Sequence, residues 1–127
     1  MDSAVLMKVP AFAELSEQER NAVATWANEA SISEGSIIVN EGEYSYTFFA
    51  ILEGSADVIR HGENIAALGP GDFFGEVGLL EKEKRNATVK ATGPMRLVTL
   101  TSWDLRRLEK EAPGAMEQIH RVLQQRR

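Results

Sequence analysis

Turn signals built on glycine recur at short intervals through the middle of the chain, and they restrict the segments between them to short strands. The signals are Glu34-Gly35, Glu41-Gly42, Glu53-Gly54, His61-Gly62, Gly69-Pro70-Gly71 and Gly93-Pro94. The segments between these turns are rich in β-branched and aromatic residues, as at 37–39, 48–52 and 56–59. Short strands separated by glycine turns are typical of a sandwich or barrel. Residues from about 30 to 101 are therefore predicted to form a β-roll.

One helix is predicted before the roll and two helices after it. A capping-box pattern that begins at Ser16 predicts an N-terminal helix over about 16–28. The segment at about 102–127 begins with Ser102 as a candidate cap and contains a helix break at Pro113-Gly114. Its last part has an apolar face at helical spacing, made of Met116, Ile119 and Leu123. This order of elements predicts a mainly β fold with flanking helices.

Composition predicts one folded domain over all 127 residues, because 43% hydrophobic and 26% charged residues are ordinary values for a globular protein. The net charge of −5 repels polyanions, so we expect no nucleic acid as a partner. The absence of cysteine excludes thiolate metal sites and thiol catalysis, and it fits a reducing compartment such as the cytoplasm. The longest apolar run, at 48–52, is too short for a bilayer, and the N-terminus has no secretory signal. We therefore expect a soluble cytoplasmic protein without membrane contact.

The strongest chemical signal is the string Phe-Gly-Glu-Val-Gly-Leu-Leu at 74–80, followed after four charged residues by Arg-Asn-Ala-Thr-Val at 85–89. This order resembles the phosphate-binding cassette of cyclic nucleotide-binding domains, and it places the cassette at 73–89. A lone pair of glycines, or a lone Glu and Arg at this spacing, would be weak, whereas the whole ordered string is specific. The resemblance extends from about Phe12 to the end of the chain.

The resemblance implies a role for each residue of the cassette. Glu76 accepts a hydrogen bond from the ribose 2′-hydroxyl, and Arg85 meets the charge of the cyclic phosphate with a planar fork of donors. Gly75 and Gly78 let the backbone approach the ligand without a Cβ in the way. If a helical turn begins at Val77, its first N–H groups lack intrahelical partners and point toward the anion. The same string adds three candidate ligand-binding residues, Asn86, Ala87 and Thr88.

The resemblance also implies a fold, an eight-stranded jelly-roll with one helix before it and two after it. In this family the last helix is a lid over the base, and Arg126 stands at a position similar to that of a lid arginine in bacterial cyclic nucleotide-gated channels. Arg126 has a second interpretation, because cations favour helix C-termini and chain ends fray. Both interpretations stay open from the sequence.

Three positions depart from the family pattern. Lys84 stands where many members have proline, and Gly78 stands where many have alanine, which leaves the turn more flexible before ligand binds. Asn86 follows Arg85, whereas cGMP-preferring members usually carry threonine there and the cAMP-dependent protein kinase pattern has alanine. Asparagine fits neither habit, but it lacks the hydroxyl that selects guanine. The sequence therefore favours cAMP, with cGMP as the alternative ligand.

Other functions compete with a ligand sensor. Glu76 and Arg85 can also be interpreted as an ion pair that pins a loop, in a module that has lost its ligand and binds only proteins. Either module can hold an effector protein or a second copy through the C-terminal helix. A cupin-type enzyme needs clustered metal ligands, yet His61 and His120 form no motif, so we expect neither catalytic residues nor a metal. A DNA-binding regulator of the catabolite activator type needs a helix-turn-helix, which these 127 residues do not contain.

Overall fold

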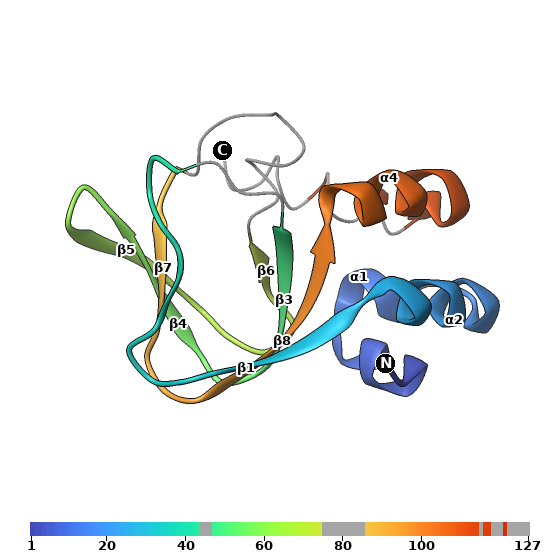
Figure 1. Cartoon of the computed structure of the whole chain (residues 1–127), viewed down its shortest axis with the longest axis horizontal. Coiled ribbons are helices and arrows are strands. Elements are labelled where there is room, and N and C mark those ends of the chain that lie inside the picture. The colour runs from blue at the N-terminus through green and yellow to red at the C-terminus, as the bar shows by residue number, and fades with distance from the viewer. Residues whose placement is uncertain (44–46, 75–85, 115, 118–120, 122–127) are drawn as a thin grey trace.

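The computed structural model describes residues 1–43, 47–74, 86–114, 116, 117 and 121. These residues form two four-stranded sheets with antiparallel pairing, which face each other in Figure 1. The first sheet contains, in spatial order, β1 (Asn28–Ile32), β8 (Met95–Thr101), β3 (Thr47–Glu53) and β6 (Phe73–Phe74). The second contains β2 (Ile37–Val39), β7 (Thr88–Ala91), β4 (Ala56–Arg60) and β5 (Glu63–Leu68). The predicted β-roll is confirmed.

The N-terminal helix predicted at about 16–28 is α2 (Glu17–Trp26). Its capping box forms as expected, because Ser16 Oγ accepts from the Glu19 amide at 3.1 Å and the Glu19 carboxylate accepts from the Ser16 amide at 3.0 Å. The helix ends earlier than predicted, since Asn28 already pairs with Thr99 across β1 and β8. Two short helical segments that the sequence did not predict precede it, η1 (Ser3–Lys8) and α1 (Pro10–Ala13).

After the roll comes α4 (Ser102–Glu111). The predicted cap at Ser102 is wrong, because Thr101 at the end of β8 caps this helix. Thr101 Oγ1 accepts from the Asp104 amide at 3.3 Å, and the Asp104 carboxylate accepts from the Thr101 amide at 2.8 Å. Residues 113, 114, 116, 117 and 121 are helical, in keeping with a second C-terminal helix. Ile119 and Leu123, two residues of the predicted apolar face, lie outside the described residues.

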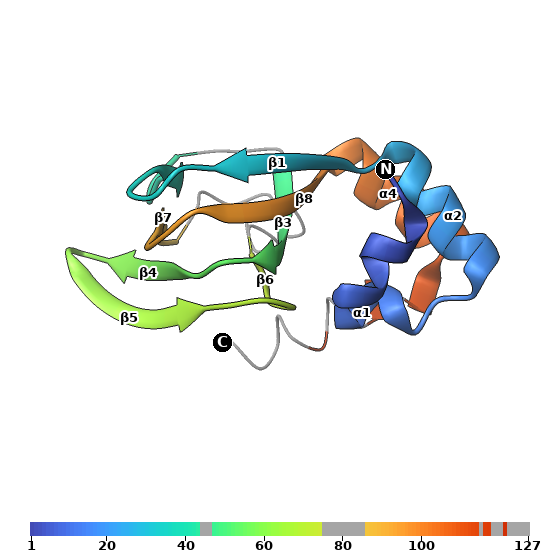
Figure 2. The same cartoon turned by 90° about the horizontal axis from the view of Figure 1, so that it is seen from below.

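Side chains alternate along β3 and β8, so the first sheet contributes to two hydrophobic clusters. The outer cluster joins this sheet to the helices and takes from the strands Phe48, Ala50, Leu52, Phe73, Val98 and Leu100. The inner cluster fills the space between the sheets and contains Val39, Ile51, Ala56, Phe74, Val89, Ala91, Met95 and Leu97. The first sheet is therefore covered on both faces, and the helices lie on its far side from the second sheet (Figure 2).

Both tryptophans of the chain belong to the helical layer. Trp26 ends α2, and the guanidinium carbon of Arg107 on α4 lies 5.3 Å from its ring centroid. Trp103, in the first turn of α4, is 70% exposed, and the guanidinium carbon of Arg106 lies 4.9 Å from its ring centroid. These two contacts are of the cation–π type.

Candidate functional site

The central part of the predicted cassette, residues 75–85, lies outside the described residues, as does Arg126. Gly75, Glu76, Val77, Gly78 and Arg85 all fall in this segment or at its ends. The described chain includes the residues on either side of the segment, up to Phe74 and again from Asn86. The candidate site is therefore built from the two places where the chain enters and leaves the cassette.

The entry to the cassette is β6, a strand of two phenylalanines that face opposite clusters. Phe73 belongs to the outer cluster, with its ring centroid 5.5 Å from that of Phe48. Phe74 belongs to the inner cluster and stacks on Phe49 at 5.0 Å with 17° between the ring planes. Aromatic pairs at this spacing stabilise a structure beyond the area that they bury. The backbone before Gly75 is thus fixed from both sides of the first sheet.

The exit from the cassette is held in the second sheet. Ala87 is buried, and Val89 is buried in the inner cluster, so the chain is anchored two residues after Arg85. Thr88 lies between them on the opposite face of β7, because side chains alternate along a strand. Asn86 is exposed, and its side chain makes no hydrogen bond to the rest of the described chain. Both ends of the cassette are therefore attached to the roll.

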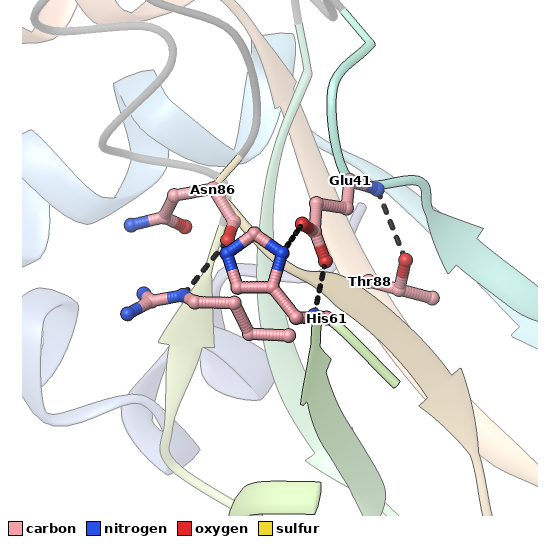
Figure 3. Close-up of polar contacts among 5 residues, drawn as sticks. Glu41, His61, Asn86 and Thr88 are labelled. Carbon is pink, nitrogen blue, oxygen red and sulfur yellow. Dashed lines mark hydrogen bonds and ion pairs between the residues drawn. The ribbon is translucent and has the colours of Figure 1, made fainter. Parts of the chain in front are cut away.

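A polar network of Glu41, Arg60, His61, Asn86 and Thr88, which we call the exit network, ties two neighbouring turns to this exit (Figure 3). Arg60 Nε donates to the Asn86 carbonyl oxygen at 3.0 Å. The Glu41 amide donates to Thr88 Oγ1 at 3.0 Å. Glu41 Oε1 accepts from the His61 amide at 3.0 Å, and Glu41 Oε2 lies 3.2 Å from His61 Nδ1. His61 has a φ of 51°, which the turn before Gly62 requires.

The described candidates differ in what the structure leaves available to a ligand. Asn86 is accessible, whereas the Thr88 hydroxyl already accepts from the Glu41 amide. The roles of Asn86, Ala87 and Thr88 toward a ligand stay predictions. Sequence reasoning missed Arg60 and Glu41 as neighbours of this site. Arg60 could have been found by extending the inward-facing positions Ala56 and Val58 by two residues.

The described residues contain neither a metal-binding cluster nor a membrane-spanning helix. They contain no group of three or more His, Asp or Glu side chains arranged to hold a metal ion. No helix among them is long and apolar enough to cross a membrane.

Comparisons with known proteins agree with the arrangement of the roll. A profile of the cyclic nucleotide-binding domain matches residues 29–111. The cAMP-dependent protein kinase regulatory subunit of Yarrowia lipolytica is 35% identical over 105 residues, which cover 81% of this chain and 28% of the relative. The corresponding subunit of Mycosarcoma maydis is 36% identical over 121 residues, 88% of this chain and 23% of the relative. The chain thus spans about a quarter of the length of these relatives.

Solved structures also share the arrangement of the roll. A structure described as cAMP-bound PfPKA-R has a TM-score of 0.88 at 31% identity, covering 97% of this chain and 43% of that one. A structure described as PKAR CBD2 bound to Sp-2Cl-cAMPS has a TM-score of 0.77 at 30% identity, covering 97% and 87%. The catabolite activator protein of Thermus thermophilus has a TM-score of 0.83 at 24% identity, covering 92% and 57%, and this likeness concerns the fold alone.

Proposed function

Because the chain belongs to the cyclic nucleotide-binding domain family, we propose that it is a non-catalytic regulatory module that binds a cyclic nucleotide, with cAMP as the first ligand. The observation that carries the proposal is the attachment of both cassette ends to the roll. Phe74 and Val89 fix the ends in the inner cluster, and the sequence between them contains Glu76 and Arg85. The names of the relatives, which are cAMP-dependent regulatory subunits, support the choice of ligand.

The proposed roles follow the chemistry of each residue. Arg85 would bind the cyclic phosphate through two parallel donors, and Glu76 would accept from the ribose 2′-hydroxyl. Backbone amides at Gly75, Val77, Gly78, Asn86 and Ala87 would supply further donors. Arg126 on the last helix and the Thr88 hydroxyl are secondary candidates. We propose no catalytic role for any residue of this set.

A regulatory module acts on something, and the relatives are named as subunits. We therefore propose an effector protein or a second copy of this chain as the partner, held through the C-terminal helix, and neither nucleic acid nor membrane. The net charge of −5 repels polyanions, and the absence of cysteine fits a reducing compartment such as the cytoplasm.

A second candidate is a protein-binding module without a ligand. The same fold occurs in the regulatory subunit of Trypanosoma brucei, which is described as belonging to a cAMP-independent kinase. That structure shares the fold with a TM-score of 0.85 at 24% identity, covering 95% of this chain and 44% of that one. The fold is thus compatible with a subunit of a kinase that does not depend on cAMP.

Calorimetric titration separates the two candidates. The proposal expects cAMP to bind with a dissociation constant between roughly 0.1 and 50 µM, and 5′-AMP to bind far more weakly, because the cyclic phosphate is the recognised group. A parallel titration with cGMP measures the purine preference. If folded protein gives no heat with either cyclic nucleotide at millimolar concentration, the protein-binding module replaces the sensor.

A further inference from the structure

The second sheet has an outer face, which points away from the first sheet and from the helices (Figure 1). Val89 and Ala91 of β7 belong to the inner cluster, so Lys90 between them faces outward. Because residues paired across antiparallel strands share a face, one outward row crosses the whole sheet. From β2 to β5 this row consists of Ile37, Lys90, Asp57 and Ala67. It has an apolar residue at each edge and two opposite charges in the middle.

Large apolar side chains are exposed on the second sheet. Among the described residues, four such side chains are about half exposed or more, and two of them lie on its edge strands, Ile37 at 53% on β2 and Ile65 at 49% on β5. Ala67 is also exposed, and the outward-facing Ile59 of β4 is only half-buried. Apolar side chains that gather on one exposed face are typical of a contact surface.

The two charges in the middle of the row have no ion-pair partner within the described part of the chain. Lys90 is exposed, and Asp57, its cross-strand neighbour on β4, is half-buried. Asn64 Nδ2 lies 3.5 Å from Asp57 Oδ2, which is longer than an ordinary hydrogen bond. A cation and an anion therefore lie side by side on a partly apolar face, and each is available to an opposite charge on another molecule.

We propose that this outer face is a self-association surface, through which two copies of the chain pack sheet on sheet. A two-fold axis parallel to the strands, between β7 and β4, brings β7 of one copy over β4 of the other and keeps the strands aligned. Lys90 then lies opposite Asp57 of the second copy, and symmetry forms the same pair twice. The larger Ile37 lies opposite the small Ala67 of the second copy at each edge.

The face is thus complementary to itself in both charge and side-chain size, which is why the occupant is a second copy of this chain. This surface is separate from the C-terminal helix. The inference does not rest on the proposed function, because no nucleotide takes part in the contact.

Sedimentation equilibrium of the 127-residue protein without nucleotide tests the inference. Wild type is expected to form a reversible dimer with a dissociation constant of about 1–100 µM. Lys90→Asp places like charges opposite each other twice and should raise this constant at least about tenfold, and Asp57→Lys should do the same. An equimolar mixture of the two variants forms both opposite-charge pairs again and should associate about as tightly as wild type.

Two further variants and a control complete the experiment. The double variant Lys90→Asp/Asp57→Lys exchanges the charges within one chain and should dimerise like wild type, whereas Ile37→Ser should weaken the dimer. Lys110→Asp, at an exposed lysine of α4, is the matched control and should leave the constant unchanged. Circular dichroism and a thermal melt confirm that each variant is folded.

Three results would overturn the inference. A wild type that stays monomeric at millimolar concentration has no such surface. A dimer that Lys90→Asp and Asp57→Lys leave unchanged uses another surface, such as the C-terminal helix. Variants that weaken the dimer singly, but that neither the mixture nor the double variant restores, show that the two charges do not meet across a two-fold axis.

Discussion

The two sheets of this domain have the same number of strands but very different surroundings. The first sheet is packed on both faces, by the helices through the outer cluster and by the second sheet through the inner cluster. Among the described residues, the second sheet is packed on one face only, and that packing decreases toward Val58 and Arg60, where the cassette exits. This difference suggests that the first sheet mainly stabilises the fold, whereas the open end of the second sheet is the surface that binds ligand.

The largest expected effect concerns stability. Phe48 on β3 is fully buried in the outer cluster, so Phe48→Ala should lower the free energy of unfolding by about 3–5 kcal/mol. Val58→Ala, on the open end of the second sheet, should cost about 1 kcal/mol or less because Val58 is only half-buried. Urea denaturation of both variants measures the difference. Equal costs would abolish the distinction between the sheets.

Arg85→Ala tests whether binding belongs to the cassette end of the second sheet. Loss of the proposed counter-charge to the phosphate should weaken cAMP binding by about 2–5 kcal/mol, as seen when one partner of a buried charge pair is removed. Arg85→Lys should recover only part of this loss, because a point charge cannot reproduce the two-pronged contact. The melting temperature without ligand should change far less than the affinity. A variant that binds cAMP normally would remove Arg85 from the site.

Glu76→Gln should weaken cAMP binding by about 1.5–3 kcal/mol, since it replaces one charge-assisted hydrogen bond to a neutral hydroxyl. The ligand 2′-deoxy-cAMP serves as the control, because it lacks the hydroxyl that Glu76 is proposed to bind. It should bind wild type weakly and be nearly indifferent to the substitution. Equal weakening of both ligands would instead identify Glu76 as a structural partner of Arg85.

Thr101→Ala should lower the free energy of unfolding by about 1 kcal/mol, because it removes the cap of α4 on the first sheet's side of the molecule. Ser102→Ala is the matched control and should lower the free energy of unfolding by only about a few tenths of a kcal/mol. Nucleotide affinity should be the same in both variants, as measured by titration. A Thr101→Ala variant with normal stability but weakened binding would show that this side of the molecule contributes to ligand binding and not to stability.

The smallest effect is expected at Arg96, which pairs with Glu29 at 2.6 Å and with Glu53 at 3.2 Å on the surface of the first sheet. Exposed ion pairs contribute about 0–1 kcal/mol, so Arg96→Met should change the urea midpoint only slightly. A loss well above 1 kcal/mol would show that this exposed pair is coupled to the packed sheet.

The sequence predicted the fold where local signals and tertiary structure agree. Glycine turns such as Glu53-Gly54 mark true strand ends, and Gly54 must be glycine because a Cβ there would clash with the Pro94 carbonyl oxygen. The capping box at Ser16 was found for the same reason, since its pattern is local. The cap of α4 was misplaced by one residue, although the roll was predicted to end at 101, because Thr101 is both the last residue of β8 and the N-cap of α4.

Some residues of the candidate site could be predicted from the sequence and others could not, for a related reason. The cassette string is contiguous, so its residues could be identified from the sequence, although their positions toward a ligand stay predictions. Arg60 ends β4 and Glu41 follows β2, both more than ten residues before the cassette, and only the pairing of β7 with β4 and with β2 brings them to Asn86 and Thr88. Contacts of this kind have no local signal.

The positions of Trp26 and Trp103 have a spectroscopic consequence. Both indoles lie in the helical layer beside arginines of α4, and the first sheet separates that layer from Arg60 and Asn86. Since the chain has no other tryptophan, its intrinsic fluorescence would report on the helices, and not on direct contact with a nucleotide bound at the proposed site. A change in emission during a titration would therefore show that ligand binding alters the helical layer, on the other side of the first sheet. Because Trp103 is largely in water and Trp26 is partly buried, a quencher such as iodide would distinguish which of the two responds.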